Sequence, residues 1–518
     1  MRRLRLRLRL RLRLRLGAGL GLGVGTGLRT GLRLGVVCGT VWVGAVCGTV
    51  WGQDTVRVAV LGGAYDDRAA ALVAASGGGV HVLGTSNSAE SGWNELFVAR
   101  LDAEGALVRM QTYPVPPFAQ CVGGWEGEGG RVWAALVHPS EGGYGVVWQA
   151  VEADGQPGPQ AGYATGGWEV PAAAAGGPGG AVTALTTYGS GLGDVGLLFH
   201  PAAGPQTSNA PPWTAPAPAT EEAAADVALF DGTAYVAFTR APDAPADARA
   251  AVALVDTATG AAVTWTSPVA GTVAEAVDAG PSGAVVLMTR RLPPADPASP
   301  ATYRLAMARL APDGTELWFS TLPAGGDMEG RAVVWTVDGA QYATAAVTSA
   351  YGLGGPEVLY SRFNGAGTWG GGPTFGTPDA DTPVDVVRTP DGAVWIAATS
   401  DGYGNGRDDI AVYRLPTPDL GTPELDVHLH LTDGTVGLPA SPPPAAAALH
   451  PNPTRGPAHG LPAGAPWRLL DLAGRPLRTG TGPSLDLTGL PPGPYLVVPD
   501  GSGTNLAPFP PHRILLVE

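Results

Sequence analysis

A glycine followed by a short apolar strand recurs seven times in this 518-residue sequence, at intervals of about 50 residues. A period of this length is typical of proteins that repeat one supersecondary unit. The seven glycines are Gly78, Gly130, Gly180, Gly232, Gly283, Gly339 and Gly392. The repeat predicts equivalent positions, on the second strand of successive units, for Val80, Val132, Val182, Ala234, Val285, Gln341 and Val394.

Each repeat is predicted to form four antiparallel strands. An Ala-rich strand such as residues 70–74 precedes the glycine, and a second apolar strand such as residues 96–101 follows the glycine-led one. Turn residues such as Asp313-Gly314 then lead into a closing strand. Seven such units predict an all-β fold, a seven-bladed β-propeller over residues 53–415.

The amino-acid sequence of the first repeat supports this prediction. It reads Leu61-Gly62-Gly63, Asp66-Asp67 and then Gly84-Thr85-Ser86. Over about residues 55–415 the chain resembles the β-propeller repeats of bacterial secreted proteins, which implies the fold and says little about function.

Ring closure can also be predicted. Residues 55–61 match the outermost strand of a blade, whereas the seventh repeat lacks an obvious fourth strand after Leu415. Because an open ring would expose strand edges, we expect residues 55–61 to complete the seventh blade, antiparallel to residues 410–415.

Composition fits a turn-rich all-β protein. The chain has 78 Gly and 50 Pro, yet 45% of its residues are hydrophobic, which argues against disorder. Its formal net charge of −14 argues against nucleic acid and anionic membranes as partners.

Residues 1–52 are predicted to be a low-complexity basic segment and a signal peptide. Arg-Leu dipeptides run from Arg3 to Leu16, and an uncharged stretch from Leu34 to Trp51 precedes Gly52. A basic segment, an apolar run and a small residue before a polar segment are the parts of a secretory signal, with cleavage expected after Gly52. The alternative is a transmembrane helix, which the glycine content of the run disfavours, so we expect no transmembrane anchor in the mature protein.

Cysteine usage predicts a fold without disulfides. Cys38 and Cys47 lie in the segment expected to be removed, which leaves Cys121 alone. No base lies near Cys121 in the sequence, so we expect a small buried residue there.

The last part of the chain is predicted to be a separate domain. Residues 416–448 are rich in Pro and Ala and are expected to form a linker, in which residues 425–431 could be a strand. From residue 449 to residue 518, the order of motifs resembles the type A sorting domain of the type IX secretion system. The residues that carry the resemblance are Pro451, Asn452, Pro453, Asp471, Gly474, Gly493 and Tyr495.

This resemblance implies a small β-sandwich that ends with a strand at residues 514–517. It also implies, as partners, the type IX secretion machinery and its sortase-like peptidase, and a secreted or outer-surface location reached through the periplasm. His450 and Glu518 depart from the usual pattern. From the residues alone, an ordinary adhesive β-sandwich is the alternative.

No recognised catalytic motif occurs in the sequence. His428 and His430 would point the same way on a strand and could bind a metal, but an exposed linker strand explains them better. The loop at residues 401–409 is rich in Asp but lacks EF-hand spacing, so a hairpin loop is expected.

Acidic residues recur near the start of the innermost strand in five repeats. They are Asp67, Glu169, Glu221, Glu329 and Asp381. In a closed ring they could gather at one mouth of the channel and hold a cation or a cationic ligand group. The alternative is that each acid accepts backbone N–H groups of the loop between two blades. No cofactor is predicted, with calcium as the one candidate.

Three functions remain open at this point. The first is an exported or cell-surface propeller that binds a glycan, peptide or cation without catalysis. The second is a secreted hydrolase or lyase that uses channel-mouth acids such as Asp67 and Asp381. The third is a structural spacer. The sequence favours the first because it supports the others less.

Overall fold

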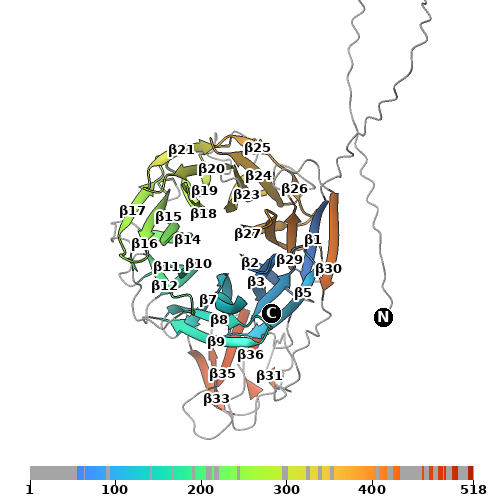
Figure 1. Ribbon diagram of the computed structural model, residues 1–518. Coiled ribbons are helices and arrows are strands. Elements are labelled where there is room, and N and C mark those ends of the chain that lie inside the picture. Colours follow the sequence, from blue (N-terminus) through green and yellow to red (C-terminus); the bar gives the residue numbers. More distant parts are fainter. Residues whose placement is uncertain are drawn as a thin grey trace, which may run out of the picture. The chain divides into compact units, whose positions relative to one another are not determined.

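The computed structural model describes residues 55–431 apart from residue 64 and short loop segments, together with strand segments between residues 458 and 516. Seven sheets stand radially around a central opening (Figure 1). The chain is the seven-bladed β-propeller that the repeat predicts. In each blade, the first strand lines the central channel and the later strands lie progressively farther out.

Each blade takes one repeat of the sequence. Blade 1 consists of β2 (Asp67–Ala74), β3 (Val80–Ser86), β4 (Glu95–Leu101) and β5 (Leu107–Pro114). Blade 2 consists of β6 (Gln120–Glu126), β7 (Val132–Ser140), β8 (Gly143–Val151) and β9 (Pro157–Tyr163), with a short 3-10 turn η1 (Glu128–Gly130) after β6. Blade 3 consists of β10 (Glu169–Gly177), β11 (Gly180–Thr187), β12 (Asp194–His200) and β13 (Trp213–Thr214).

The next three blades follow the same plan. Blade 4 consists of β14 (Glu222–Phe230), β15 (Thr233–Arg240), β16 (Arg249–Asp256) and β17 (Ala262–Thr266). Blade 5 consists of β18 (Thr272–Gly280), β19 (Gly283–Leu292), β20 (Thr302–Leu310) and β21 (Glu316–Thr321). Blade 6 consists of β22 (Met328–Trp335), β23 (Gln341–Thr348), β24 (Glu357–Asn364), β25 (Trp369–Gly371) and β26 (Thr374–Phe375).

The seventh blade is assembled from both ends of the domain. It orders β27 (Asp381–Arg388), β28 (Val394–Ser400), β29 (Asp409–Leu415), β1 (Thr55–Gly62) and β30 (Glu424–Leu431) from the channel outwards. β1 is antiparallel to β29, with Arg57 opposite Arg414 and Leu61 opposite Ile410, so the predicted closure is confirmed. β30 is parallel to β1 over its whole length. The strand foreseen inside the linker is therefore the outermost strand of the ring.

The predicted equivalence of seven second-strand residues holds in four blades. The innermost strands supply the reference, because each contains a β-bulge near its third residue. Measured from the bulge, Val80, Val132, Ala234 and Val394 are equivalent. In blades 3, 5 and 6 the matching residues are Ala181, Ala284 and Tyr342, one position away from Val182, Val285 and Gln341. In blades 3 and 5 the glycine itself begins the second strand, which moves the register by one; Gly339 lies outside the described residues.

Neighbouring blades are joined by a threonine on the second strand of one blade and a backbone N–H on the innermost strand of the next. For example, Thr239 Oγ1 accepts a hydrogen bond of 3.0 Å from Ala274 N. The same contact joins Thr85 to Cys121, Thr186 to Ala224, Thr289 to Gly330 and Thr399 to Ala69.

At the two remaining junctions, a proline occupies the position of the donor residue. Pro171 and Pro383 occupy this position on β10 and β27. Proline has no N–H to donate, and the preceding blade carries Val137 or Val347 where the other blades carry threonine. The hydroxyl is thus present only where the next blade offers a donor.

The apolar core lies between blades rather than inside any one of them. At the closure, Val82 and Phe97 of blade 1 share one buried cluster with Trp395 and Val412 of blade 7. Burial of both faces of every blade explains why the strands are nearly continuous in apolar residues.

The C-terminal region forms its own sheets. β33 (Pro476–Thr481), β32 (Pro466–Leu470), β35 (Gly493–Pro499) and β36 (His512–Leu516) make a four-stranded antiparallel sheet, and β31 (Ala458–His459) pairs with β34 (Ser484–Leu485). This is a small sandwich-like region, as predicted. Gly493 and Tyr495 lie on β35, where Tyr495 is opposite Ile514. Pro451, Asn452, Pro453, Asp471 and Gly474 lie outside the described residues.

None of the helices among the described residues is long and apolar enough to cross a membrane.

Candidate functional site

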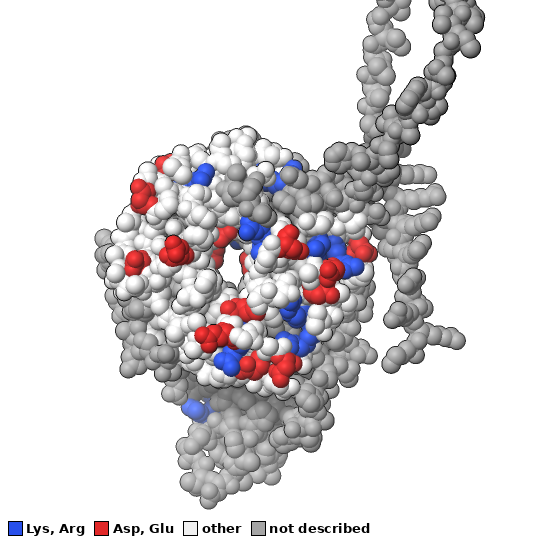
Figure 2. Space-filling view, in the orientation of Figure 1, with Lys and Arg blue, Asp and Glu red and all other residues white. Residues whose placement is uncertain are grey.

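The central channel of the propeller is a cavity with a volume of about 1600 Å³. The innermost strands of all seven blades line it, and Figure 2 shows the opening through the ring. Ala, Gly and Val make most of the wall, because seven strands that converge on one axis leave little room for larger side chains.

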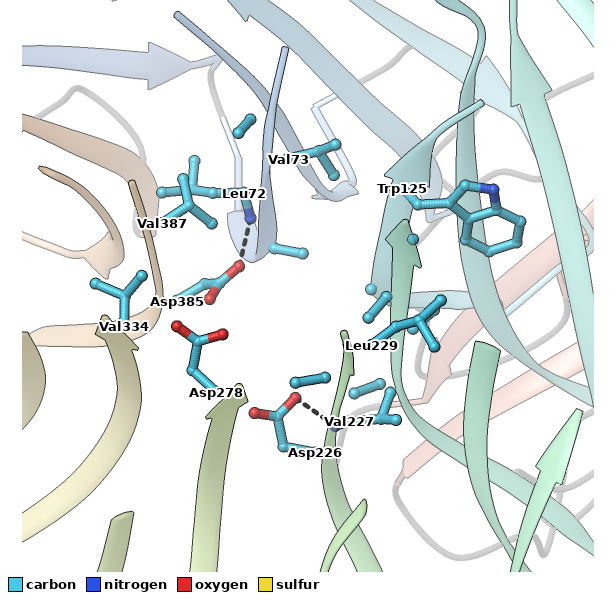
Figure 3. Close-up of a pocket in the computed structure, with 18 of the residues that line it drawn as sticks. Leu72, Val73, Trp125, Asp226, Val227, Leu229, Asp278, Val334, Asp385 and Val387 are labelled. Atoms are coloured by element: carbon cyan, nitrogen blue, oxygen red, sulfur yellow. Dashed lines mark hydrogen bonds between the residues drawn. The ribbon is translucent and has the colours of Figure 1, made fainter. Parts of the chain in front are cut away.

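Three aspartates interrupt this small apolar wall. Asp226 lies on β14, Asp278 on β18 and Asp385 on β27, and their carboxylates face the lumen (Figure 3). All three side chains are partly buried. They place three carboxylates in one space.

Each of these carboxylates is oriented by the next blade. Asp226 accepts a hydrogen bond of 2.8 Å from Val277 N, and Asp278 accepts one of 2.8 Å from Trp335 N. Asp385 accepts one of 2.7 Å from Leu72 N. The other oxygen of each carboxylate accepts the N–H of the residue that follows it in the chain. The aspartates therefore join blades 4 to 5, 5 to 6 and 7 to 1, and their positions are fixed before any ligand arrives.

Burial makes these groups hard to ionise. It raises the pKa of Asp226 to about 7 and the pKa values of Asp278 and Asp385 to about 6. The backbone N–H groups act in the opposite direction because they stabilise the charged form. Repulsion from Asp385 raises the pKa of Asp226 further, and repulsion from Asp278 raises the pKa of Asp385 further. A positive group in the lumen would offset both the burial of the charged carboxylates and their mutual repulsion.

One ion pair lies on the channel wall. Glu275 and Arg331 are the extra residues in the bulges of β18 and β22, and Arg331 Nη1 lies 3.7 Å from Glu275 Oε2. Burial raises the pKa of Glu275 to about 7, and Arg331 lowers it. Arg331 also pairs with Glu329 at 2.8 Å. Arg331 thus serves two glutamates, whereas the positive charge of Arg388, which also lines the channel, lowers the pKa of Asp278 alone among the three aspartates.

The acids predicted to ring the channel mouth occupy separate blade junctions. Asp67 begins β2 and is 1% exposed, and its Oδ2 accepts hydrogen bonds from Gly63 N at 2.7 Å and Ser88 Oγ at 2.8 Å. Asp381 begins β27 and is buried, and its Oδ2 accepts a hydrogen bond from Thr377 N at 2.5 Å. Both contacts are of the kind that the alternative interpretation describes.

The other predicted acids are placed differently. Glu169 begins β10 and is buried. Glu222, not Glu221, begins β14, where it is buried and pairs with Arg240 at 2.9 Å. Glu329 is the second residue of β22. None of the five predicted acids is among the residues that line the channel.

Sequence reasoning missed the three channel aspartates. Each stands within an Ala/Val run on an innermost strand, as in Ala224-Ala225-Asp226-Val227. An acid inside a strand that is otherwise small and apolar is the signal that could have identified them.

The remaining predicted candidates can be placed as well. His428 lies on β30, and its Nε2 is 2.9 Å from Asp426 Oδ2. Burial and neighbouring His428 lower the pKa of His430. Within the described ranges, no three or more His, Cys, Asp or Glu residues are grouped as a metal site would require. Residues 404–407 of the Asp-rich loop lie outside those ranges.

Cys121 is buried, and burial raises the pKa of its thiol to about 12. An unreactive small side chain is therefore present at this position, as expected.

Comparison with known proteins does not identify a family for this chain. No protein-family model matches the chain, and no curated protein is similar to it in sequence. Among solved structures, a periplasmic gluconolactonase from Pseudomonas aeruginosa shares 14% identity, with a TM-score of 0.38, over 59% of this chain and 84% of its own. A Lactobacillus plantarum protein shares 12% identity, with a TM-score of 0.40, over 62% of this chain and 90% of its own. A Dyadobacter fermentans protein of unknown function shares 11%, with a TM-score of 0.39, over 69% and 98%. These similarities are too distant to assign this chain to a family or to an activity.

Proposed function

We propose that this chain is an exported, non-catalytic propeller that binds a cationic group, such as the amine or guanidinium of a peptide, in its channel. The observation that carries the proposal is the convergence of Asp226, Asp278 and Asp385 on one lumen (Figure 3). Their blade-to-blade hydrogen bonds hold them ready, so binding would require little reorganisation.

The electrostatics favour a positively charged ligand. Partly buried carboxyls with raised pKa values are protonated in part near neutral pH, and a cation that enters the lumen would displace those protons. We therefore expect affinity to rise as the pH increases through about 6 to 7, with proton release on binding.

The rest of the wall suits an extended ligand. Its small apolar side chains leave a space of about 1600 Å³ that could accept a peptide segment. Peptide binding therefore agrees better with this wall than binding of a bare metal ion does, because a metal would need more oxygen ligands than three separated carboxylates supply.

The exported location belongs to the same proposal. It is supported by the resemblance of residues 449–518 to a type IX type A sorting domain and by the signal-like residues 1–52. The exported form is expected to lack residues 1–52 and most of residues 449–518, which intact-mass measurement of the culture medium and the cell surface would test.

The hydrolase or lyase alternative gains no support at the predicted mouth residues. Asp67 and Asp381 are both buried, and each already accepts hydrogen bonds from its own loop. A catalytic pair would need two carboxyls that reach a substrate from opposite sides of the reacting bond.

Calorimetric titration with a short lysine peptide, and with the same peptide carrying acetyl-lysine, tests the channel assignment. The lysine peptide is expected to bind, and acetylation is expected to weaken binding at least about tenfold because it removes the charge. Asp278→Asn should weaken lysine-peptide binding similarly, since asparagine keeps an acceptor for Trp335 N but loses the charge. Asp313→Asn, in an exposed turn, is the matched control and should bind normally. Equal affinity for the two peptides would contradict the proposal.

A further inference from the structure

The junction of blades 7 and 1 contains a second group of carboxylates, which are not among the residues that line the channel. β1 ends at Gly62, β2 begins at Asp67 and β29 begins at Asp409. Asp67 and Asp409 are each 1% exposed. A Cβ placed on Gly62 would lie 2.2 Å from Asp409 Oδ1 and 3.1 Å from Asp67 Oδ2. The two carboxylates therefore border the same small space, which glycine leaves open.

The hydrogen bonds at this junction are incomplete. Asp67 Oδ2 accepts from Gly63 N and Ser88 Oγ, so one side of this carboxylate is satisfied. Asp67 Oδ1 and Asp409 Oδ1 are both buried, and neither has a hydrogen-bond partner in the part of the chain that the structure describes. Buried oxygens without partners are costly, so one on each of two neighbouring carboxylates indicates that something else is bound there.

No arginine compensates for this pair among the described residues. Where blade 3 meets blade 4, Glu222 stands at the position equivalent to Asp67, and Arg240 pairs with it at 2.9 Å. At the junction of blades 7 and 1, Arg68 instead pairs with Asp408 at 2.8 Å. Burial, followed by repulsion from Asp67 and Asp408, raises the pKa of Asp409 to about 6. The two neighbouring buried carboxylates therefore lack a positively charged partner among the described residues.

We propose that a calcium ion binds between Asp67 and Asp409 and joins the first blade to the last. The donors around this space are oxygens: the two carboxylates, the hydroxyls of Ser86 and Ser88 beside Asp67, and the carbonyl of Asp408, which accepts from Asp67 N at 2.7 Å. Oxygen donors select hard cations over zinc or copper. Burial favours calcium over magnesium, because magnesium gives up its water reluctantly. Since only two carboxylates converge, neutral oxygens would complete the coordination.

This site does not depend on ligand binding in the channel. Its effect would be structural, because β2 and β29 belong to the two blades that the closure must hold together. An ion bound only by the closed ring shifts the folding equilibrium towards that ring.

Thermal unfolding of the full chain, with about 1 mM calcium and separately with EGTA, tests the proposal at a pH about one unit above the pKa of Asp409. Calcium is expected to raise the melting temperature by about 2–4 °C once it is well above its dissociation constant. Asp409→Asn should lose this response. It should also be at least as stable as the unaltered chain in EGTA, because the substitution removes the repulsion. Asp408→Asn, the matched control, should keep the response because Asp408 pairs with Arg68.

Direct calcium titration of the unaltered chain by calorimetry remains informative if Asp409→Asn does not fold. Saturable binding by the unaltered chain supports the site, as does a loss of affinity of at least about tenfold in an Asp409→Asn variant that folds. Two results would overturn it: no calcium binding, or a calcium response that survives Asp409→Asn.

Discussion

Replacing Thr239 with valine tests the contact that joins most neighbouring blades. Thr239 Oγ1 accepts a hydrogen bond of 3.0 Å from Ala274 N, and both residues are 3% exposed. Valine has nearly the same shape, so packing should change little, but Ala274 N would lose its partner in a buried position. Leaving a buried donor unpaired costs about 1–3 kcal/mol, so we expect the free energy of unfolding to fall by about 2 kcal/mol.

Urea unfolding, followed by tryptophan fluorescence, measures this change. Thr239→Ser is the matched control, since it keeps the hydroxyl and loses one methyl group, at a cost of about 1 kcal/mol. Val137→Thr is a second control: it adds a hydroxyl opposite Pro171, which has no N–H to donate, and should give no stabilisation. The reasoning is refuted if Thr239→Val costs less than Thr239→Ser, or if Val137→Thr stabilises the protein.

Three other measurements follow from the structure. Burial raises the pKa values of Asp278 and Asp385 from the ordinary 3.8 to about 6 in the folded chain, so the folded chain binds protons more tightly than the unfolded chain between these values. Its free energy of unfolding should therefore fall as the pH rises from about 4 to about 6, and less steeply in an Asp278→Asn, Asp385→Asn double variant. An equal slope in the two proteins would contradict this. Cys121, buried and with a pKa of about 12, should resist iodoacetamide in the native protein and react in urea, as peptide mass mapping can show; rapid native labelling would show that the strand opens. Deleting Thr55–Gly62 should lower the melting temperature of the whole propeller by opening blade 7, and unchanged melting would rule out a stabilising role for this closure.

The architecture could be predicted because it depends on features that repeat along the chain. Glycine-led apolar strands recur at a near-constant period. Residues 55–61 match an outermost strand and precede the first full repeat, which indicates how the ring closes. The register was harder to predict. The repeat period does not reveal a one-residue difference at the hairpins before Gly180 and Gly283. This difference moves Val182 and Val285 away from the equivalent position.

The candidate site was harder still, because its determinants lie on different blades. The role of Asp226 can be recognised only from its contact with Val277 N, and that of Asp67 only from its position next to Asp409, which lies far along the chain. The spacing of acids in the sequence predicts strand starts correctly at Asp67 and Asp381 but points to Glu221 where Glu222 begins the strand. A bulge and a variable loop are enough to move a side chain to the other face of its strand.

The parallel pairing of β30 with β1 also determines how the ring would respond to mechanical load. The chain enters β1 at Thr55 and leaves β30 at Leu431, and these residues lie at opposite ends of the paired strands. Tension applied through the two flanking segments would therefore pull the strands past each other along their length. Such shearing loads all the hydrogen bonds between the two strands together, whereas peeling would break them one at a time. A load carried by β30 would thus be resisted by the whole strand pair before the blade that closes the ring opens.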